Sequence, residues 1–173
     1  MIVAFVVSLV SLYALACYPN LARTVPTNYA LLGVFTVSEA YIVACITTFY
    51  TPMSVLNAAL LTTAIVIGLT VYAFKTTTDF TYYGGLLFMA SFGLLMAMFL
   101  GIFINSNWFQ IMISLFAILL FGVYLIYDTQ LIMGGEGKSA SYTIDDYILG
   151  AINIYLDIIN IFVQILKIIG NKE

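Results

Sequence analysis

The chain has 173 residues, of which 64% are hydrophobic and 8% are charged, and its formal net charge is −3. An ordinary soluble domain has about 25% charged residues, so this composition excludes a globular protein with a water-facing surface. The sequence contains no His and no cysteine cluster, which argues against a zinc or haem site. We therefore expect an integral membrane protein.

Six apolar segments follow one another along the chain, each bounded by turn-forming or charged residues. A bilayer leaves backbone groups no partner outside their own segment, and these runs lack the alternation of barrel strands, so we expect transmembrane α-helices. The apolar start is interpreted as a span, because no charged n-region or cleavage site accompanies it. Short connections predict one antiparallel bundle, a single domain over residues 1–173. The approximate segments are 2–17, 29–50, 53–74, 82–104, 108–133 and 146–169.

Basic residues outside these segments indicate the orientation. If all six segments cross, the loops with Arg23, Lys75 and Lys138 share one side, which the positive-inside rule makes cytoplasmic. Lys167 and Lys172 would then lie on the opposite side. If the last segment instead enters and returns, all the basic residues lie on the cytoplasmic side. The length of the segment favours full crossing, and the charges favour the alternative.

The last segment carries a polar seam. Its members follow one another at spacings of 4, 3 and 4 residues and are Asn153, Asp157, Asn160 and Gln164. Such spacings place the four side chains on one face of a helix. A carboxylate in the middle of a span costs about 2.5–3.5 kcal/mol on insertion scales and marks a functional site by default. The seam must therefore face partner side chains or water.

Two further acids, Glu39 and Asp128, lie within apolar segments. The fifth and sixth segments are expected to be antiparallel neighbours, so Asp128 can approach Asp157. Two carboxyl groups in a low dielectric cannot both ionise easily, so they would share a proton and respond to pH. Carboxylate oxygens are also the ligands that Ca²⁺ prefers. A functional role is favoured for this pair, whereas for Glu39 a structural role as a protonated residue between helices is favoured over a place in the pore lining.

The two acids that precede the last segment have a simpler interpretation. Asp145 and Asp146 follow Thr143 at the expected start of the sixth helix. Acidic side chains are favourable at a helix N-terminus because they interact with the helix dipole. We therefore interpret them as helix-starting charges and not as part of a site.

Four segments carry more specific sequence patterns: LLGVFTVSEA, LTVYAFKTTTDF, YLIYDTQLIMGG and IDDYILGAINIYLDIINIF. They resemble the transmembrane Bax inhibitor motif family, and within it the Lifeguard and Golgi anti-apoptotic protein branch. The last two are the specific ones. An Asp in YDTQ on the penultimate helix and an Asp in YLDIIN on the last helix, separated by a short hydrophilic loop, are the family's signature. The resemblance covers residues 2–170.

The resemblance implies a bundle of seven helices, with the last one in the centre, that lets Ca²⁺ leak across intracellular or bacterial membranes in a pH-dependent way. Asp128 and Asp157 would be the proton-sharing dyad and transient Ca²⁺ ligands, and Arg23 would be the candidate ion-pair partner of Asp128. Eukaryotic members of the family are linked to protection against cell death. Since six segments are present here, the resemblance also implies that the family's first helix is missing or supplied by a partner.

These observations predict a pH-sensitive Ca²⁺ leak channel with a cell-death-suppressing role in an intracellular membrane. The lining or seal of the path would come from Asn153, Asn160, Gln164 and Glu39. The alternative is a non-conducting scaffold, or a subunit of a larger membrane complex, that modulates partner proteins.

Other functional expectations follow from the same features. No enzyme is expected, because the GxGD motif of intramembrane aspartyl proteases is absent. The expected partners are the lipid bilayer, Ca²⁺, protons, and cell-death regulators or other membrane subunits. Neither a cofactor nor a nucleic acid is expected. The resemblance implies the Golgi or the endoplasmic reticulum as the location, with the mitochondrial inner membrane as the alternative.

Overall fold

The computed structural model describes residues 1–104, 106–134 and 138–171, and it contains helices and no strands in these ranges. Each of the six predicted segments corresponds to one long helix, so the prediction of an all-α membrane bundle is confirmed. The long helices are α1 (Ile2–Cys17), α3 (Thr27–Thr47), α4 (Pro52–Lys75), α5 (Gly84–Phe103), α6 (Asn107–Met133) and α7 (Tyr147–Ile169). Three short helices connect them, namely α2 (Pro19–Arg23), η1 (Phe80–Tyr83) and η2 (Ile144–Asp146).

The helices differ in whether they can span a membrane. Among the described residues, 5 helices are long and apolar enough to cross, and they are α3, α4, α5 with η1, α6, and α7 with η2. α1 is apolar but has only 16 residues, slightly below the roughly 17–25 of a typical transmembrane helix. It ends just before Pro19, because a proline disfavours helical geometry in the residue that precedes it.

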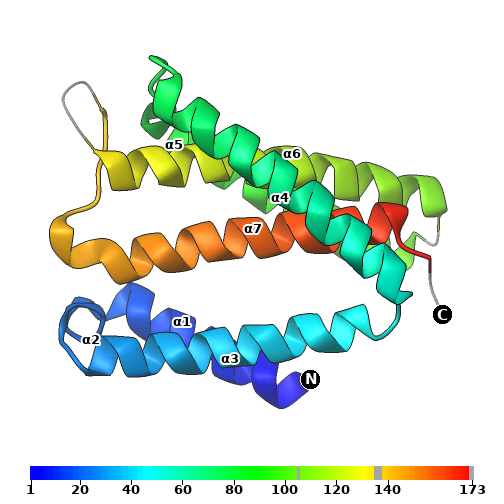
Figure 1. The fold of residues 1–173 in the computed structure, drawn as a ribbon, viewed down its shortest axis with the longest axis horizontal. Helices are drawn as coiled ribbons and strands as arrows, with labels where there is room; N and C mark the ends of the chain where they lie inside the picture. Colours follow the sequence, from blue (N-terminus) through cyan, green and yellow to red (C-terminus); the bar gives the residue numbers. More distant parts are fainter. Residues whose placement is uncertain (105, 135–137, 172–173) are drawn as a thin grey trace.

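α7 lies at the centre of the bundle, as predicted (Figure 1). It packs against α6 and α4 on one side and against α1, α2 and α3 on the other. α5 lies further out and packs on α6 and η1. Aliphatic side chains fill the main interface, where Leu125 of α6 and Ala58 of α4 meet Ile161, Ile165 and Leu166 of α7.

α7 also passes from one end of the bundle to the other. At its beginning Asp146 contacts Arg23, and just beyond its end Asn171 exchanges hydrogen bonds with the start of α4: Thr51 N–H donates to Asn171 O, and Asn171 N–H donates to Ser54 Oγ, both at 3.0 Å. Of the two arrangements that the sequence allowed, the structure therefore has the full-length one. Lys172 lies outside the described residues.

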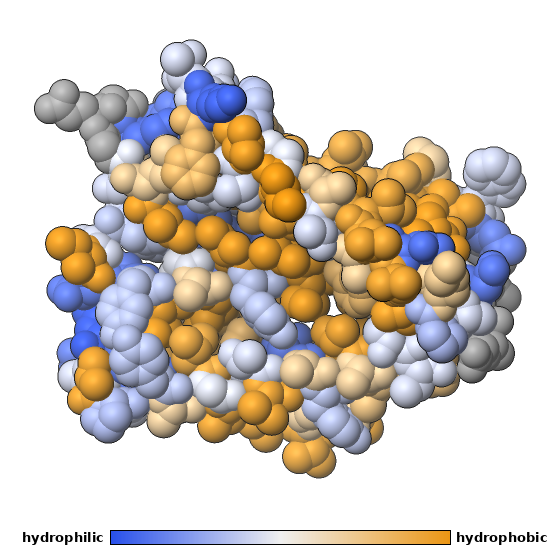
Figure 2. Space-filling model, in the orientation of Figure 1, coloured by the Kyte–Doolittle hydropathy of each residue, from blue (hydrophilic) through white to orange (hydrophobic). Residues whose placement is uncertain are grey.

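The surface pattern agrees with a membrane orientation. Figure 2 shows hydrophobic residues over much of the middle of the visible face and hydrophilic residues towards its two ends. The segment after α2, the end of α4 and residues 138–143 lie at the same end of the bundle (Figure 1). This end carries the positive charge that favours the cytoplasmic side of a membrane.

Hydrogen bonds between helices and their connections contribute to stability, and those of Gln130 can be tested by mutation. Gln130 is fully buried, its Oε1 accepts the Phe80 N–H at 2.8 Å, and its Nε2 donates to Thr78 O at 3.0 Å. Gln130→Leu would leave both main-chain groups without these partners, which costs about 1–3 kcal/mol. We expect a clear drop in melting temperature in detergent. Gln110→Leu is the control, because exposed Gln110 makes one bond, to Gly101 O; equal drops would contradict the prediction.

Candidate functional site

The interface of α6 and α7 brings together the two acids that the sequence singled out. Asp128 is 4% exposed near the end of α6, and Asp157 is 5% exposed near the middle of α7. Their carboxyl groups lie within hydrogen-bonding reach of each other. The first turn of α7 lies beyond the end of α6 (Figure 1). This offset explains why both acids line one cavity although they are at unequal distances from the loop.

One oxygen of the pair is left without a partner. Asp157 Oδ2 is buried and accepts no hydrogen bond from any residue in the described part of the chain. Most buried polar atoms in proteins have a partner, and leaving one unpaired costs about 1–3 kcal/mol. The position is therefore costly for stability, which is typical of a group retained to bind a proton or an ion.

A cavity of about 590 Å³ lies against the acid pair, between α5, α6, α7 and residues 140–142. This volume is within the range of about 300–1,000 Å³ typical of ligand sites. Its polar side chains, apart from the two acids, are Ser91, Tyr124, Tyr127, Ser141, Tyr142, Asn153 and Asn160. The lining is thus rich in neutral groups that can donate or accept hydrogen bonds.

Several lining groups are fixed by hydrogen bonds to one another. Asn153 Nδ2 donates to Tyr142 Oη at 2.7 Å, and the hydroxyls of Ser91 and Tyr124 lie 2.8 Å apart. These contacts join α7 to the segment before η2, and α5 to α6. The cavity wall is consequently held by polar contacts from all of its elements.

A comparison with known proteins agrees with this geometry. A family model described as "Inhibitor of apoptosis-promoting Bax1" matches residues 1–173. The chain belongs to this Bax inhibitor family. The resemblance inferred from YDTQ and YLDIIN is therefore confirmed.

Curated relatives place the chain near two named groups of the Bax inhibitor family. Protein lifeguard 4 of Mus musculus is 38% identical over 145 residues, which cover 84% of this chain and 58% of that protein. The Golgi anti-apoptotic protein of vaccinia virus (strain Lister) is 36% identical over 150 residues, covering 86% of this chain and 61% of the viral protein. The chain thus spans about three fifths of the length of these relatives.

The residues of the polar seam do not all lie at the same site. Asn153, Asp157 and Asn160 line the cavity, whereas Gln164 does not. Gln164 is 2% exposed, and its Oε1 accepts a hydrogen bond from Ser114 Oγ of α6 at 3.0 Å. The seam therefore divides into a cavity part and a structural part that joins α6 to α7.

Glu39 lies apart from the cavity. It is half-buried on α3, and its Oε1 accepts a hydrogen bond from Ser8 of α1. This contact joins α1 to α3, which is the structural role that the sequence favoured for this acid.

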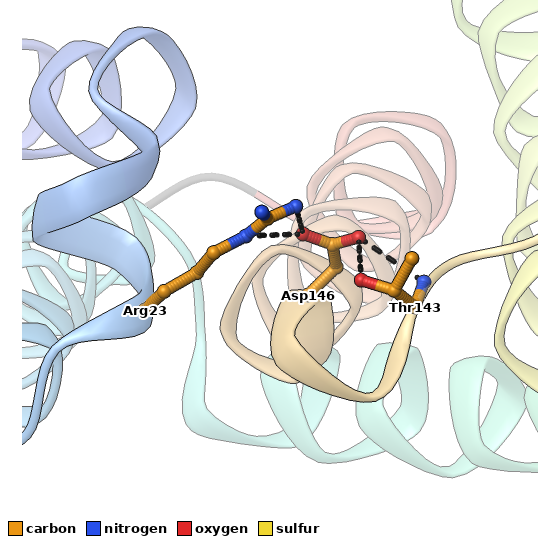
Figure 3. A network of polar contacts seen from close by, with 3 residues as sticks. All are labelled: Arg23, Thr143 and Asp146. Carbon is orange, nitrogen blue, oxygen red and sulfur yellow. Dashed lines mark hydrogen bonds and ion pairs between the residues drawn. The ribbon is translucent and has the colours of Figure 1, made fainter.

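Arg23 forms its ion pair with Asp146 and not with Asp128. Its Nη2 lies 2.8 Å from Asp146 Oδ1, and its Nε donates to the same oxygen at 3.2 Å (Figure 3). Asp146 Oδ2 also accepts from the N–H and the hydroxyl of Thr143, so the two residues form a capping box. The interpretation of Asp146 as a helix-starting charge is confirmed. Hydrogen bonding and charge from Asp146 raise the pKa of Arg23 further above its usual value.

The connection between α4 and η1 contains an acid that the sequence did not single out. Asp79 Oδ2 accepts from the N–H and hydroxyl of Ser139 at 2.8 and 2.6 Å, and Oδ1 accepts from the N–H and hydroxyl of Thr81 at 3.0 and 2.6 Å. The hydroxyls of Ser139 and Thr81 hold the pKa of Asp79 well below its usual range. The carboxylate therefore stays ionised, and its hydrogen bonds persist, at any pH from weakly acidic upwards.

The residues that sequence reasoning missed are mainly the tyrosines of the cavity. Tyr124 and Tyr127 precede Asp128 by four residues and one, and the three side chains line one cavity. The spacing of Tyr124 and Asp128 was a usable signal, because residues four apart share a helix face. The contribution of Tyr142 had no local signal, since its position depends on how the loop folds back. No group of three or more His, Cys, Asp or Glu side chains that could hold a metal occurs in the described ranges.

The division of the seam predicts that Gln164 matters for stability and not for ion passage. Ser114→Ala would leave Gln164 Oε1 buried without its donor, at a cost of about 1–3 kcal/mol. We expect a lower melting temperature in detergent. Adding Gln164→Leu should restore part of the loss, because the unpaired oxygen is then gone.

Ion flux through both variants, measured in liposomes, should match that of the parent chain once the amounts of folded protein are equal. A change in the pH dependence of flux on Ser114→Ala would place Gln164 in the functional site after all.

Proposed function

We propose that this chain provides a pH-sensitive path for Ca²⁺ across an intracellular membrane, controlled by Asp128 and Asp157. The observation that carries the proposal is the placement of two buried carboxyl groups beside one polar cavity, with Asp157 Oδ2 unpaired in the described structure. A buried acid pair inside a membrane bundle is costly and is found mainly at ion and proton pathways.

The pair can switch between two physical states. With a shared proton, the two carboxyl groups are linked by a hydrogen bond across the α6–α7 interface and carry little charge. When both ionise, they repel each other and attract cations. Because the two groups titrate as a unit, one proton changes both the packing of α6 on α7 and the affinity of the cavity for a cation.

Ca²⁺ fits this chemistry as a passing ion. Ca²⁺ takes about 6–8 oxygen ligands, of which carboxylates and amide oxygens are common kinds. Asp128 and Asp157, with the side-chain amides of Asn153 and Asn160, provide about six oxygens at most, the lower end of this range, and fewer if either carboxylate binds through one oxygen. A Ca²⁺ ion here would keep part of its water shell and bind weakly, and weak binding is what conduction requires.

The names of the relatives support a role in cell survival. One relative is named the Golgi anti-apoptotic protein, and this name supports the suppression of cell death from a Golgi membrane as the role of this chain. A leak lowers the Ca²⁺ content of a store, so the two parts of the proposal are compatible.

The ion path is tested with purified protein in liposomes that contain a Ca²⁺-sensitive dye, over a series of pH values, because two coupled carboxyl groups titrate as a unit. We expect flux that changes with pH in the parent chain. Asp157→Asn and Asp128→Asn should each alter this change, because the coupled titration of two acids is replaced by that of one.

Asp145→Asn is the matched control for loss of one acid. Asp145 is exposed at the end of the bundle and outside the cavity, so its replacement should leave flux and pH profile unaltered. The dyad mechanism fails if Asp157→Asn retains the pH dependence of the parent.

The survival role is tested by expressing the chain in cultured cells that then receive an apoptotic stimulus. We expect a larger surviving fraction with the parent chain and with Asp145→Asn, and loss of this protection with Asp157→Asn at equal membrane expression. Protection by Asp157→Asn equal to that of the parent, together with a stable complex with other proteins after gentle solubilisation, would favour the non-conducting scaffold.

A further inference from the structure

One wall of the cavity comes from a short extended segment between α6 and η2. Ala140, Ser141 and Tyr142 all line the cavity beside the acid pair. We call residues 138–142 the strap. The strap lies at the end of the bundle where the segment after α2 and the end of α4 also lie (Figure 1).

The strap is attached to a part of the chain about 60 residues earlier. Both donors of Ser139 bind Asp79 Oδ2, and the Ala140 N–H donates to Thr81 Oγ1 at 3.1 Å. Thr81 in turn donates its own hydroxyl to Asp79 Oδ1. Two of the three bonds between the strap and this earlier segment end on the Asp79 carboxylate, and the third ends on Thr81, whose hydroxyl Asp79 holds in place.

The base of this attachment is itself held in place. Gln130 binds the main chain of Thr78 and Phe80 on either side of Asp79, which fixes the connection to α6. At its other end the strap is held through Tyr142. The Tyr142 N–H donates to Leu131 O at 2.9 Å, and the Tyr142 hydroxyl accepts a hydrogen bond from Asn153 Nδ2. The strap is therefore bound at both ends, with Asp79 responsible for the first.

The residues of the strap give it few other anchors. Ser139, Ala140 and Ser141 are small and exposed, so little apolar burial holds this part in place. Hydrogen bonds to an ionised carboxylate are about twice as strong as those between neutral groups. The position of residues 138–141 consequently depends mainly on Asp79.

We propose that the strap restricts aqueous access to the acid pair from this end of the bundle and that Asp79 is the positioning residue that keeps it in place. Release of Ser139 and Ala140 from Asp79 and Thr81 would move one wall of the cavity away from Asp128 and Asp157. The consequence for Ca²⁺ flux rests on the proposed function, whereas the consequence for access does not.

Access is measured by thiol labelling in a chain with Cys17→Ser and Cys45→Ala. Ser91→Cys then places the reporter thiol in the cavity wall. The chain is reconstituted in lipid nanodiscs, treated with a charged methanethiosulfonate reagent that does not enter hydrocarbon, and followed by mass spectrometry. We expect Asp79→Ala to raise the labelling rate about tenfold or more, since loss of a charge-assisted hydrogen bond shifts a local opening equilibrium by at least that factor.

Three matched controls make the result specific. Asp145→Ala removes an acid at the same end without touching the strap and should leave the rate unchanged. A thiol at Thr48→Cys, exposed in the connection between α3 and α4, should react equally fast with and without Asp79. A thiol at Ala58→Cys, fully buried in the core against α7, should stay unreactive in both backgrounds.

The possible outcomes separate the strap from the channel. An unchanged rate at Ser91→Cys in Asp79→Ala overturns the proposal, and so does simultaneous reactivity of Ala58→Cys, which would indicate general loosening. If Asp79→Ala does not fold, Ser139→Ala replaces it, with a smaller increase expected because the Ser139 N–H bond remains. Faster labelling supports the strap even if the liposomes show no Ca²⁺ flux, in which case only the proposed function fails.

Discussion

The burial of two carboxyl groups between α6 and α7 is the constraint on which the rest of the structure depends. Hydrocarbon offers no hydrogen bonds, so Asp128 and Asp157 have to be surrounded by protein or by a polar cavity. This requirement explains why α7 is central, with other helices on both sides, and why tyrosine hydroxyls and asparagine amides collect around the pair. A peripheral helix with the same seam would expose it to lipid.

The same constraint explains the residues at one end of the bundle. For Asp157 to reach the depth of Asp128, α7 has to begin beyond the end of α6, so the chain between them folds back beside Leu131. That return needs a fixed support, which comes from the TTTDF segment through Asp79 and from the YDTQ segment through Gln130. Two sequence patterns that are 50 residues apart therefore serve one purpose, which is to place the acid pair.

Much of the fold followed from the sequence, because hydrophobic length and helical periodicity are local properties. The six segments, the seam on the last helix and the helix-starting role of Asp146 needed no knowledge of neighbours. The partners of Arg23, Glu39 and Gln164 could not be obtained in this way, since each depends on how one helix is rotated against another. Arg23 is the clearest case. The start of α7 comes close to α2, so Arg23 forms its ion pair with Asp146, whereas the family resemblance implied Asp128 as its partner.

The direction of the last helix shows how packing outweighs a charge rule. Counting basic residues favoured an α7 that returns, because Lys167 otherwise lies opposite Arg23, Lys75 and Lys138. Yet α7 has partners at both ends. Before its first residue Asp146 forms an ion pair with Arg23. After its last residue Asn171 forms hydrogen bonds with Thr51 and Ser54. A returning helix would lose the second set and would withdraw Gln164 from Ser114 in the buried interface. The charge bias acts weakly on any one loop, whereas these buried and terminal contacts are lost together, so a single helix along the full length of the bundle is the arrangement that this sequence stabilises.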